Sequence, residues 1–343
     1  MISASIVSGF FSSFADSWLV YSVLRMSKFF FICGGFVIGM ALTHLLNISE
    51  KFKTRLLVAF LMMWSFGFVI LAGLAYYFRG WRNLQLAQTA FSLFGLLGLW
   101  LKKTGLNVDS VSSFSGHEES EPSVAVKLEN VIVDKTDVGE ASNVFNLPFH
   151  KKIELIKVVS LMFTMGLVLF MFILDDREIG INLYLFKAVA ALIDSLFMIS
   201  LAPLIEKYSH SFCLKNGFFI CIFTNLSVIL LKIYGLDEKY AAVMLVLKFV
   251  GRSVVNMIWN LGCVLMAGLM PSKVRTSCLG FAIAASNIGA AFAPQVLVTK
   301  SVISSFPEII CGFVLVFDLV LIWSLPRAAE VRLLTIKLIF SRL

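Results

Sequence analysis

The chain consists of long apolar runs separated by short polar connections. A helix needs about 20 apolar residues to cross a bilayer. Four runs precede a long polar stretch, although the first is short and rich in serine, and six runs follow it. The predicted spans are residues 2–15, 19–46, 56–78, 84–101, 154–174, 183–205, 214–234, 239–269, 277–299 and 307–325. This pattern predicts an all-α membrane protein with about ten transmembrane helices.

The polar stretch divides the apolar runs into two groups. It is rich in Ser, Glu, Asp and Asn and lacks a helical period, which is typical of a disordered linker. The predicted organisation is an incomplete N-terminal bundle of four spans, a polar cytoplasmic linker, a C-terminal bundle of six spans and a short cytoplasmic tail. The boundaries are 1–103, 104–150, 151–326 and 327–343.

The distribution of Lys and Arg over the connections predicts the orientation. The richer set of connections carries basic clusters at 51–55, 151–152 and 273–275, whereas the poorer set carries scattered residues such as Arg177 and Lys300. Basic residues accumulate on cytoplasmic loops. The linker and the C-terminus are therefore predicted to be cytoplasmic.

The composition supports the membrane class and narrows the function. The chain has 343 residues, 59% of them hydrophobic and 15% charged, with a mean hydropathy of +0.90, whereas about 25% of a soluble domain is charged. Basic cytoplasmic loops explain the net charge of +8, so no nucleic-acid partner is predicted. The six cysteines have no metal-ligand or disulfide spacing, and no catalytic or cofactor-binding motif occurs. The sequence thus predicts no enzyme, no cofactor and no metal site.

Two small-residue-rich apolar runs, from Gly251 to Pro294, flank a polar elbow at 271–276. Small residues allow membrane helices to pack backbone to backbone. Polar groups inside apolar runs face the protein interior or a water-filled path, because lipid cannot solvate them. Within the spans we therefore expect a set of cavity-facing polar residues and one aromatic stacking face. They are Asp194, Arg252, Asn256, Trp259, Asn260 and Asn287.

Two of these charges have an alternative interpretation. Asp194, in the middle of its span, could serve as a substrate or proton site, or it could form an ion pair or hydrogen bond between helices. Arg252 could face a cavity, or its long side chain could extend to the membrane interface. Both pairs of alternatives stay open.

Several short motifs occur in an order that is similar to a known transporter family. They are Gly251-Arg252, Asn260, Gly268-Leu269-Met270-Pro271-Ser272, Arg275, Asn287-Ile288-Gly289 with Pro294, and the stretches 50–55, 79–85, 206–210 and 325–326. In these motifs the chain resembles the organic cation/anion transporter (solute carrier 22-like) branch of the major facilitator superfamily. The resemblance implies a two-bundle fold in which the spans correspond to family helices 3–12, so that the chain is N-terminally truncated relative to the family.

The resemblance also implies a function. A solute transporter of this kind works by alternating access and takes a small organic ion or polar metabolite, in a multi-pass position in the plasma membrane. Inner gating contacts would lie in three loops, at Lys51, Lys53, Arg55, Glu206, Lys207, Lys273 and Arg275. At the position of Asn287 the cation carriers have Asp and the anion carriers have Arg, so the neutral amide does not specify the charge of the substrate.

Departures from the family pattern favour an alternative function. Gly268 stands where the elbow of the family has Glu, and Ser209 stands where a loop has Gly. Both positions belong to the cytoplasmic latch of the transport cycle. The alternative is a transport-inactive family member that acts as a membrane scaffold or regulator, or a gene fragment.

Overall fold

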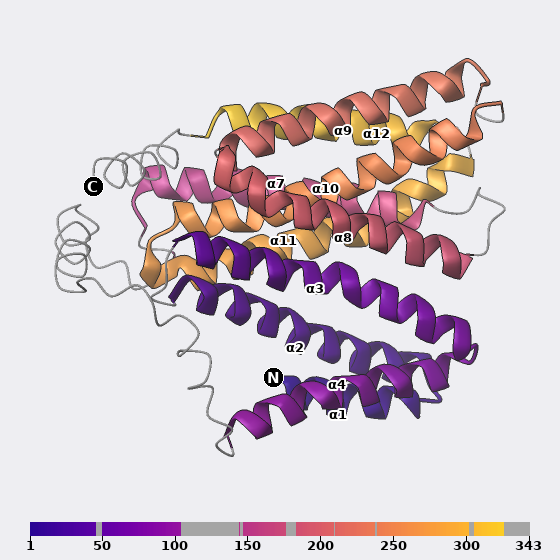
Figure 1. The fold of residues 1–343 in the computed structure, drawn as a ribbon, viewed down its shortest axis with the longest axis vertical. Helices are drawn as coiled ribbons and strands as arrows, with labels where there is room; N and C mark the ends of the chain where they lie inside the picture. The colour runs from indigo at the N-terminus through magenta and orange to yellow at the C-terminus, as the bar shows by residue number, and fades with distance from the viewer. Residues whose placement is uncertain are drawn as a thin grey trace. The chain divides into compact units, whose positions relative to one another are not determined.

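The part of the chain that the structure describes forms ten α-helices, which Figure 1 labels. The computed structural model describes residues 1–45, 50–103, 144, 147–175, 183–208, 210–236, 239–301 and 305–325, and it gives only the backbone for 41–45, 50–54, 57, 96–103, 202, 206 and 272–273. These residues form α-helices and one short 3-10 helix, η3, and no strand. The elements are α1 (Ile2–Ser13), α2 (Trp18–Leu45), α3 (Glu50–Tyr77), α4 (Trp81–Lys103), α7 (Phe149–Leu174), α8 (Leu183–Lys207), α9 (His210–Ile233), α10 (Ala241–Leu269), α11 (Ser272–Val298), η3 (Thr299–Ser301) and α12 (Phe306–Trp323).

The predicted all-α architecture is confirmed, although fewer helices qualify as spans than expected. Eight helices in the described part are long and apolar enough to cross a membrane. The first predicted span forms α1, whose 12 residues measure about 18 Å, which is too short for a hydrocarbon layer of about 30 Å. The predicted span at 84–101 forms α4, which is also not among the eight.

The polar connections are shorter than the hydropathy pattern predicts. The basic stretch at 50–55 belongs to the first turns of α3, and α11 begins at Ser272, so that Met270 and Pro271 alone separate it from α10. Charged residues can extend a helix beyond its apolar part, because backbone hydrogen bonds and not side-chain hydropathy define the helix. Pro271 precedes the first residue of α11, where its missing N–H costs nothing.

The described helices divide into two compact units. The first contains α1, α4 and the part of α2 up to Gly35, and the second contains the rest of α2, α3 and all described residues from 147 onward. In the first unit, Arg25 donates a hydrogen bond to Gln85, and Gln85 donates one to Ser12. These two side-chain hydrogen bonds link α2 to α4 and α4 to α1. The predicted domain boundaries at 103 and 150 remain a prediction.

Glycines bring α7 and α11 of the second unit into direct backbone contact. A Cβ atom on Gly289 would lie 1.9 Å from the carbonyl oxygen of Phe163, and one on Gly166 would lie 2.0 Å from the carbonyl oxygen of Ser286. No larger residue fits at either position without moving a helix. This contact is the close packing that the small residues of 251–294 predict.

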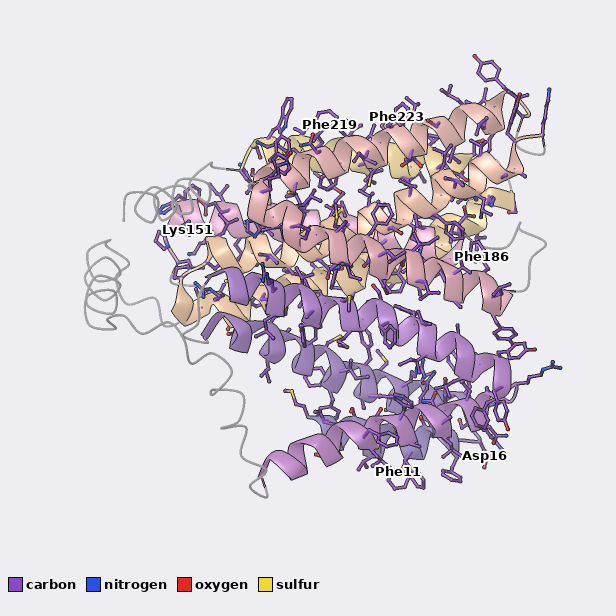
Figure 2. All side chains as sticks on the ribbon, viewed as in Figure 1. Phe11, Asp16, Lys151, Phe186, Phe219 and Phe223 are labelled. Carbon is purple, nitrogen blue, oxygen red and sulfur yellow. The ribbon has the colours of Figure 1, made fainter. Side chains whose placement is uncertain are left out.

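α10 is the central helix of the second unit. It contacts α7, α8, α9 and α11, and most of its residues from Gly251 to Leu269 are buried. Its polar residues therefore point into protein. By contrast, α9 presents aromatic side chains outward, and Figure 2 shows Phe219 and Phe223 directed away from the bundle. They are 49% and 68% exposed, as is typical of a surface that faces lipid.

Candidate functional site

A buried ion pair joins α8 to α10. Nη2 of Arg252 lies 3.3 Å from Oδ2 of Asp194, and both side chains are less than a tenth exposed. The hydroxyl of Ser253 donates a 2.6 Å hydrogen bond to the other carboxylate oxygen of Asp194. Of the alternatives for Asp194, the structure therefore shows the ion pair between helices. Both charged groups lie inside the helical bundle and not at the membrane interface.

The pair is incompletely satisfied on the side of the arginine. Nε and Nη1 of Arg252 are buried and have no hydrogen-bond partner among the described residues. An unpaired buried donor on a charged group costs more than about 1–3 kcal/mol. Buried atoms without a described partner also occur on Arg275, Glu308 and Asp318.

A row of amides continues from this pair along one face of α10. Residues 252, 256 and 260 are four apart and therefore lie on the same side of the helix. The side-chain amide of Asn256 donates to Oγ of Ser65 on α3 at 3.3 Å. The side-chain amide of Asn260 donates to the carbonyl oxygen of Asn256 at 2.8 Å, and its Nδ2 also lies 3.5 Å from Sδ of Met198 on α8. All three polar groups of the row are buried.

Trp259 connects α10 to α11. Its indole N–H donates a 2.7 Å hydrogen bond to Oγ of Ser286. Its ring lies 6.1 Å from the ring of Phe36 at an angle of 39°, and Trp259 is half-buried. The ring thus packs against an aromatic neighbour while part of it stays accessible.

Asn287 lies apart from the row on α10, in an open hollow along α11. The hollow has a volume of about 440 Å³ and is lined by Asn287, Ile288, Ala291, Phe292 and Gln295. Two neutral amides, separated by eight residues or about 12 Å of helix, flank an apolar centre. None of the five lining side chains is ionisable.

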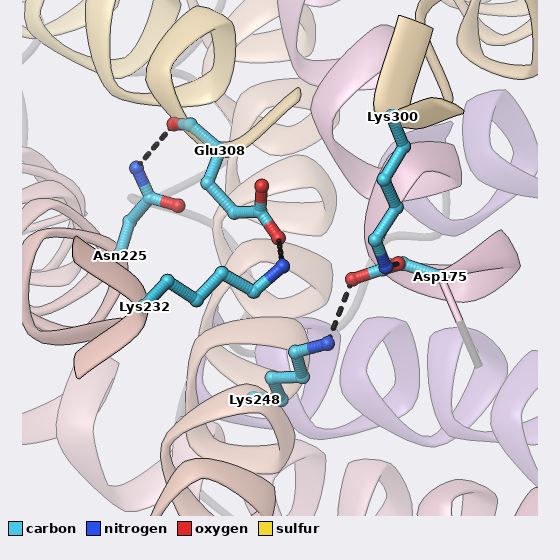
Figure 3. A network of polar contacts seen from close by, with 6 residues as sticks. All are labelled: Asp175, Asn225, Lys232, Lys248, Lys300 and Glu308. Carbon is cyan, nitrogen blue, oxygen red and sulfur yellow. Dashed lines mark hydrogen bonds and ion pairs between the residues drawn. The ribbon is translucent and has the colours of Figure 1, made fainter. Parts of the chain in front are cut away.

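A second polar cluster lies where α7 ends. Figure 3 shows the Asp175 carboxylate between the ammonium groups of Lys248 on α10 and Lys300 in η3. The distances are 2.9 Å and 2.8 Å. Burial alone would raise the pKa of Asp175, but the charge and hydrogen bond of Lys248 and those of Lys300 bring this pKa below its usual value. The carboxylate therefore stays ionised and ties three elements together.

Two further carboxyl groups are buried in α12. Glu308 pairs with Lys232 of α9 at 2.6 Å, and its backbone carbonyl accepts a hydrogen bond from Asn225, as Figure 3 shows. Asp318 accepts a hydrogen bond from the hydroxyl of Thr164 on α7. These contacts connect α12 to α9 and α7 and lie away from the row on α10.

The proposed gating residues are only partly described. The side chains of Lys51, Lys53, Glu206 and Lys273 lie outside the described residues, and the other three are described. Arg55 and Lys207 are exposed, and Arg275 is half-buried.

Sequence reasoning missed the partners of the candidate residues and the Asp175 cluster. Ser253, Ser65 and Ser286 each bind a candidate residue, yet a serine in an apolar run gives no specific signal. The Asp175 cluster had a usable signal. Asp175 and Lys300 follow apolar runs and Lys248 lies within a turn or two of the start of another, so antiparallel helices bring them to the same end.

Comparison with known proteins identifies the family. The family model of the Major Facilitator Superfamily matches residues 1–294. Similar curated proteins are Solute carrier family 22 member 6 of Pseudopleuronectes americanus, 24% identical over 89% of this chain and 57% of its own length, and Solute carrier family 22 member 13 of Homo sapiens, 25% identical over 89% and 56%. Another is Organic cation/carnitine transporter 4 of Arabidopsis thaliana, 26% identical over 89% and 61%.

The chain spans a little over half the length of these relatives. The family model nevertheless covers most of the chain, and eight described helices are suited to cross a membrane. The chain is therefore a multi-pass membrane protein that belongs to the Major Facilitator Superfamily.

Proposed function

We propose that the protein transports a small amphipathic organic ion or polar metabolite across a membrane by alternating access. The observation that carries this proposal is the row of buried polar groups on α10, which begins at the pair of Arg252 with Asp194. Polar groups in the centre of a membrane bundle are costly and mark solute or ion pathways. In two-bundle transporters the site lies near the midplane between repeats.

The relatives support the class of substrate. Their names describe two solute carriers of family 22 and an organic cation/carnitine transporter. Because they are longer than this chain, the substrate and the transport cycle are proposals here. The predicted plasma-membrane location and the cytoplasmic position of the linker and C-terminus belong to the same proposal.

The hollow along α11 is the proposed surface for contact with the substrate. Its volume of about 440 Å³ lies within the range of about 300–1,000 Å³ that is usual for small-molecule sites. The apolar centre at Ile288 and Phe292 suits an apolar body, and the amides of Asn287 and Gln295 suit hydrogen-bonding groups at its ends. The half-buried ring of Trp259 offers a further stacking face.

The remaining candidate residues have a positioning role in this proposal. Asp194 and Arg252 balance each other's charge inside the bundle, and Asn256 and Asn260 continue the polar row toward α3 and α8. The predicted gating segments at 50–55, 206–210 and 271–275, which the structure places mostly in helix ends, would open and close the inner side. Their basic residues suit contacts with carboxylates at cytoplasmic helix ends.

The experiment measures uptake into vesicles that contain the purified chain. Three labelled amphipathic solutes of similar size are compared, namely a carboxylate, a quaternary ammonium compound and a neutral amide. We expect saturable uptake of at least one solute, and we expect the double variant Asp194→Asn with Arg252→Ala to reduce this uptake at least about tenfold.

A matched control removes a different buried ion pair of the same bundle. The double variant Lys232→Gln with Glu308→Gln neutralises the pair between α9 and α12 and should leave most of the uptake in place. The proposal is contradicted if no solute enters faster than into empty vesicles. The site assignment is contradicted if uptake survives the loss of Asp194 and Arg252 unchanged.

A further inference from the structure

Asp318 is a carboxyl group in the second half of α12 to which the proposed function gives no role. The residue is fully buried, and its side chain reaches α7, where the hydroxyl of Thr164 lies 2.5 Å from its Oδ1 atom. Its Oδ2 atom has no hydrogen-bond partner among the described residues. The only described polar contact of this carboxyl group is therefore with a neutral hydroxyl.

No described cation pairs with Asp318. The elements that pack against α12 are α7, α9 and η3. The titratable groups on these elements and on α12 that lie nearest to the helix contacts have other described partners, namely Lys157 with the carbonyl of Ser324, Lys232 with Glu308, Lys300 with Asp175, Cys221 with the carbonyl of Gly251 and Cys311 with Met171. Lys215, the other lysine of α9, forms no described ion pair with Asp318. A negative charge on Asp318 would therefore be uncompensated.

The contact with Thr164 accommodates a proton on the carboxyl group. The hydroxyl of Thr164 has one proton. Three oxygen atoms lie within its reach, namely Oδ1 of Asp318 at 2.5 Å and the carbonyl oxygens of Leu161 and Ser160 at 2.8 Å and 2.9 Å. A threonine inside a helix commonly donates to a carbonyl of the preceding turn. The contact with Asp318 then needs a second proton, which a neutral carboxyl group supplies and a carboxylate does not.

The helix that carries Thr164 also contacts the hollow along α11. The carbonyl oxygen of Phe163 would lie 1.9 Å from a Cβ atom on Gly289. The ring centroids of Phe163 and Phe292 are 6.2 Å apart, and Phe292 lines the hollow. Closely packed helices transmit displacements because they have no free space between them. A movement of α11 at the hollow therefore acts on α7 and on the contact between Thr164 and Asp318.

We propose that Asp318 is a proton site whose proton is exchanged as solute passes the hollow on α11. In the arrangement of helices described here, the O–H group on Oδ1 donates to Oγ1 of Thr164, because an uncompensated buried carboxylate takes up a proton. When α7 and α12 separate, this hydrogen bond breaks and water enters. The O–H bond of the carboxyl group then breaks, the proton passes to water and a carboxylate remains. The exchange rests on the proposed function, whereas the proton in the packed bundle does not.

Infrared spectroscopy of the purified chain at pH 7 tests the proton directly. Protonated and ionised carboxyl groups absorb at different frequencies, so Asp318→Asn should remove one carboxylic acid band from the spectrum of the native chain. The control is Asp16→Asn, which removes an exposed carboxyl group paired with Arg82 and should remove carboxylate bands instead. The loss of carboxylate bands in Asp318→Asn would overturn the inference.

The stability of the same variant provides a second measurement. An amide at this position has an N–H group that can donate to Oγ1 of Thr164 as the acid does. The Tm of Asp318→Asn in detergent should therefore equal or exceed that of the native chain. Asp194→Asn is the matched comparison, because it leaves the buried charge of Arg252 uncompensated and should lower Tm. An equal fall in the two variants, or failure of Asp318→Asn to fold, would show that Asp318 is held as a charge and would overturn the inference.

Uptake into vesicles tests the exchange. A solute that enters in the transport experiment is offered at one external pH, with and without a pH difference across the membrane, while the membrane potential is held at zero. We expect the pH difference to change the initial rate of the native chain several-fold and to leave the rate of Asp318→Asn unchanged. Equal rates of the native chain would overturn the exchange. Absence of all uptake would contradict the proposed function and the exchange together, and the infrared band would still decide whether Asp318 holds a proton.

Discussion

Two helix–helix contacts inside the second unit are held together by different interactions. α7 and α11 meet through glycines, with Gly166 and Gly289 each lying against the backbone of the other helix. α8 and α10 meet through the buried charges of Asp194 and Arg252 and the polar side chains beside them. The first contact is held by close van der Waals packing, and the second by electrostatic pairing that leaves donors unused.

The two contacts differ in what they cost in a membrane. A glycine contact leaves no polar group to be solvated, so it can form in a membrane at little cost. A buried ion pair often contributes no more than an apolar pair of similar size, and here part of it is unpaired. We therefore assign the α7–α11 contact to the scaffold and keep the α8–α10 contact as part of the proposed functional site.

The largest effect is expected where the glycine contact is broken. In Gly289→Ala the new Cβ would lie 1.9 Å from the carbonyl oxygen of Phe163, so α7 and α11 must separate. Overpacking a core costs about 1–3 kcal/mol, and a clash with backbone should reach the upper end or exceed it. Thermal unfolding in detergent should show a loss of about 10 °C or no folded protein.

Gly280 provides the matched control on the same helix. A Cβ there has no described neighbour within 4 Å, so Gly280→Ala should be neutral or slightly stabilising. Equal effects of the two substitutions would remove the distinction between scaffold and site.

A loss of comparable size is expected from removing one partner of the buried pair. Asp194→Asn leaves Arg252 with a buried and uncompensated charge, which costs about 3–5 kcal/mol. Adding Arg252→Gln removes that charge and should restore more than half of the lost stability. Unfolding midpoints of the two single variants and the double variant measure this coupling. Additive losses would show that the residues do not act as a pair.

A smaller effect should appear as a dependence on pH. The pKa of Asp175 is lowered in the folded protein by Lys248 and Lys300. Its contribution to stability is therefore complete above the unfolded pKa of about 4 and is lost as the pH falls through the lower folded pKa. The stability difference between the native chain and Asp175→Asn should be full at pH 6 and should shrink toward pH 3.

The control for this titration is an exposed ion pair. Asp16 pairs with Arg82 at 2.7 Å, but its side chain is 90% exposed, and exposed pairs contribute little. Asp16→Asn should therefore leave the stability unchanged at both pH values. A gap for Asp175→Asn that stays constant with pH would contradict the proposed tie between α7, α10 and η3.

The smallest effect concerns a residue that belongs to both contacts. The backbone of Ser286 packs against Gly166, while its hydroxyl accepts the indole N–H of Trp259. Ser286→Ala removes the acceptor alone, which costs about 1 kcal/mol. We expect Tm to fall by about 2–4 °C. Ser200→Ala, at an exposed hydroxyl that bonds within its own helix, should not change Tm.

The sequence predicts the helices and the small-residue packing well, but not the partners of the polar residues. Long apolar runs correspond to helices because lipid leaves few alternatives for the backbone. Gly289 was recognisable because small residues cluster there. The assignment of Asp194 stayed open, since the position of α8 against α10 depends on packing throughout the unit. For the same reason the sequence did not predict the hydrogen bond of Asn256 to Ser65.

The hydropathy pattern also does not predict where the helices begin and end. Hydropathy assigns the basic residues at 50–55 to a loop, although they continue α3. It assigns 2–15 to a span, although α1 ends at Ser13 after 12 residues. In both cases the hydropathy pattern locates the apolar residues correctly. It does not show which backbone hydrogen bonds form, and these determine where a helix ends.

The central proposal is that the chain moves an organic solute by alternating access, and exchange across vesicles tests it most directly. Vesicles with the purified chain are preloaded with unlabelled solute, and the entry of labelled solute is followed. An alternating-access carrier should take up the label several-fold faster into preloaded vesicles than into unloaded ones, because the loaded site returns more readily. Equal rates in both, or uptake no faster than in empty vesicles, would contradict the proposal.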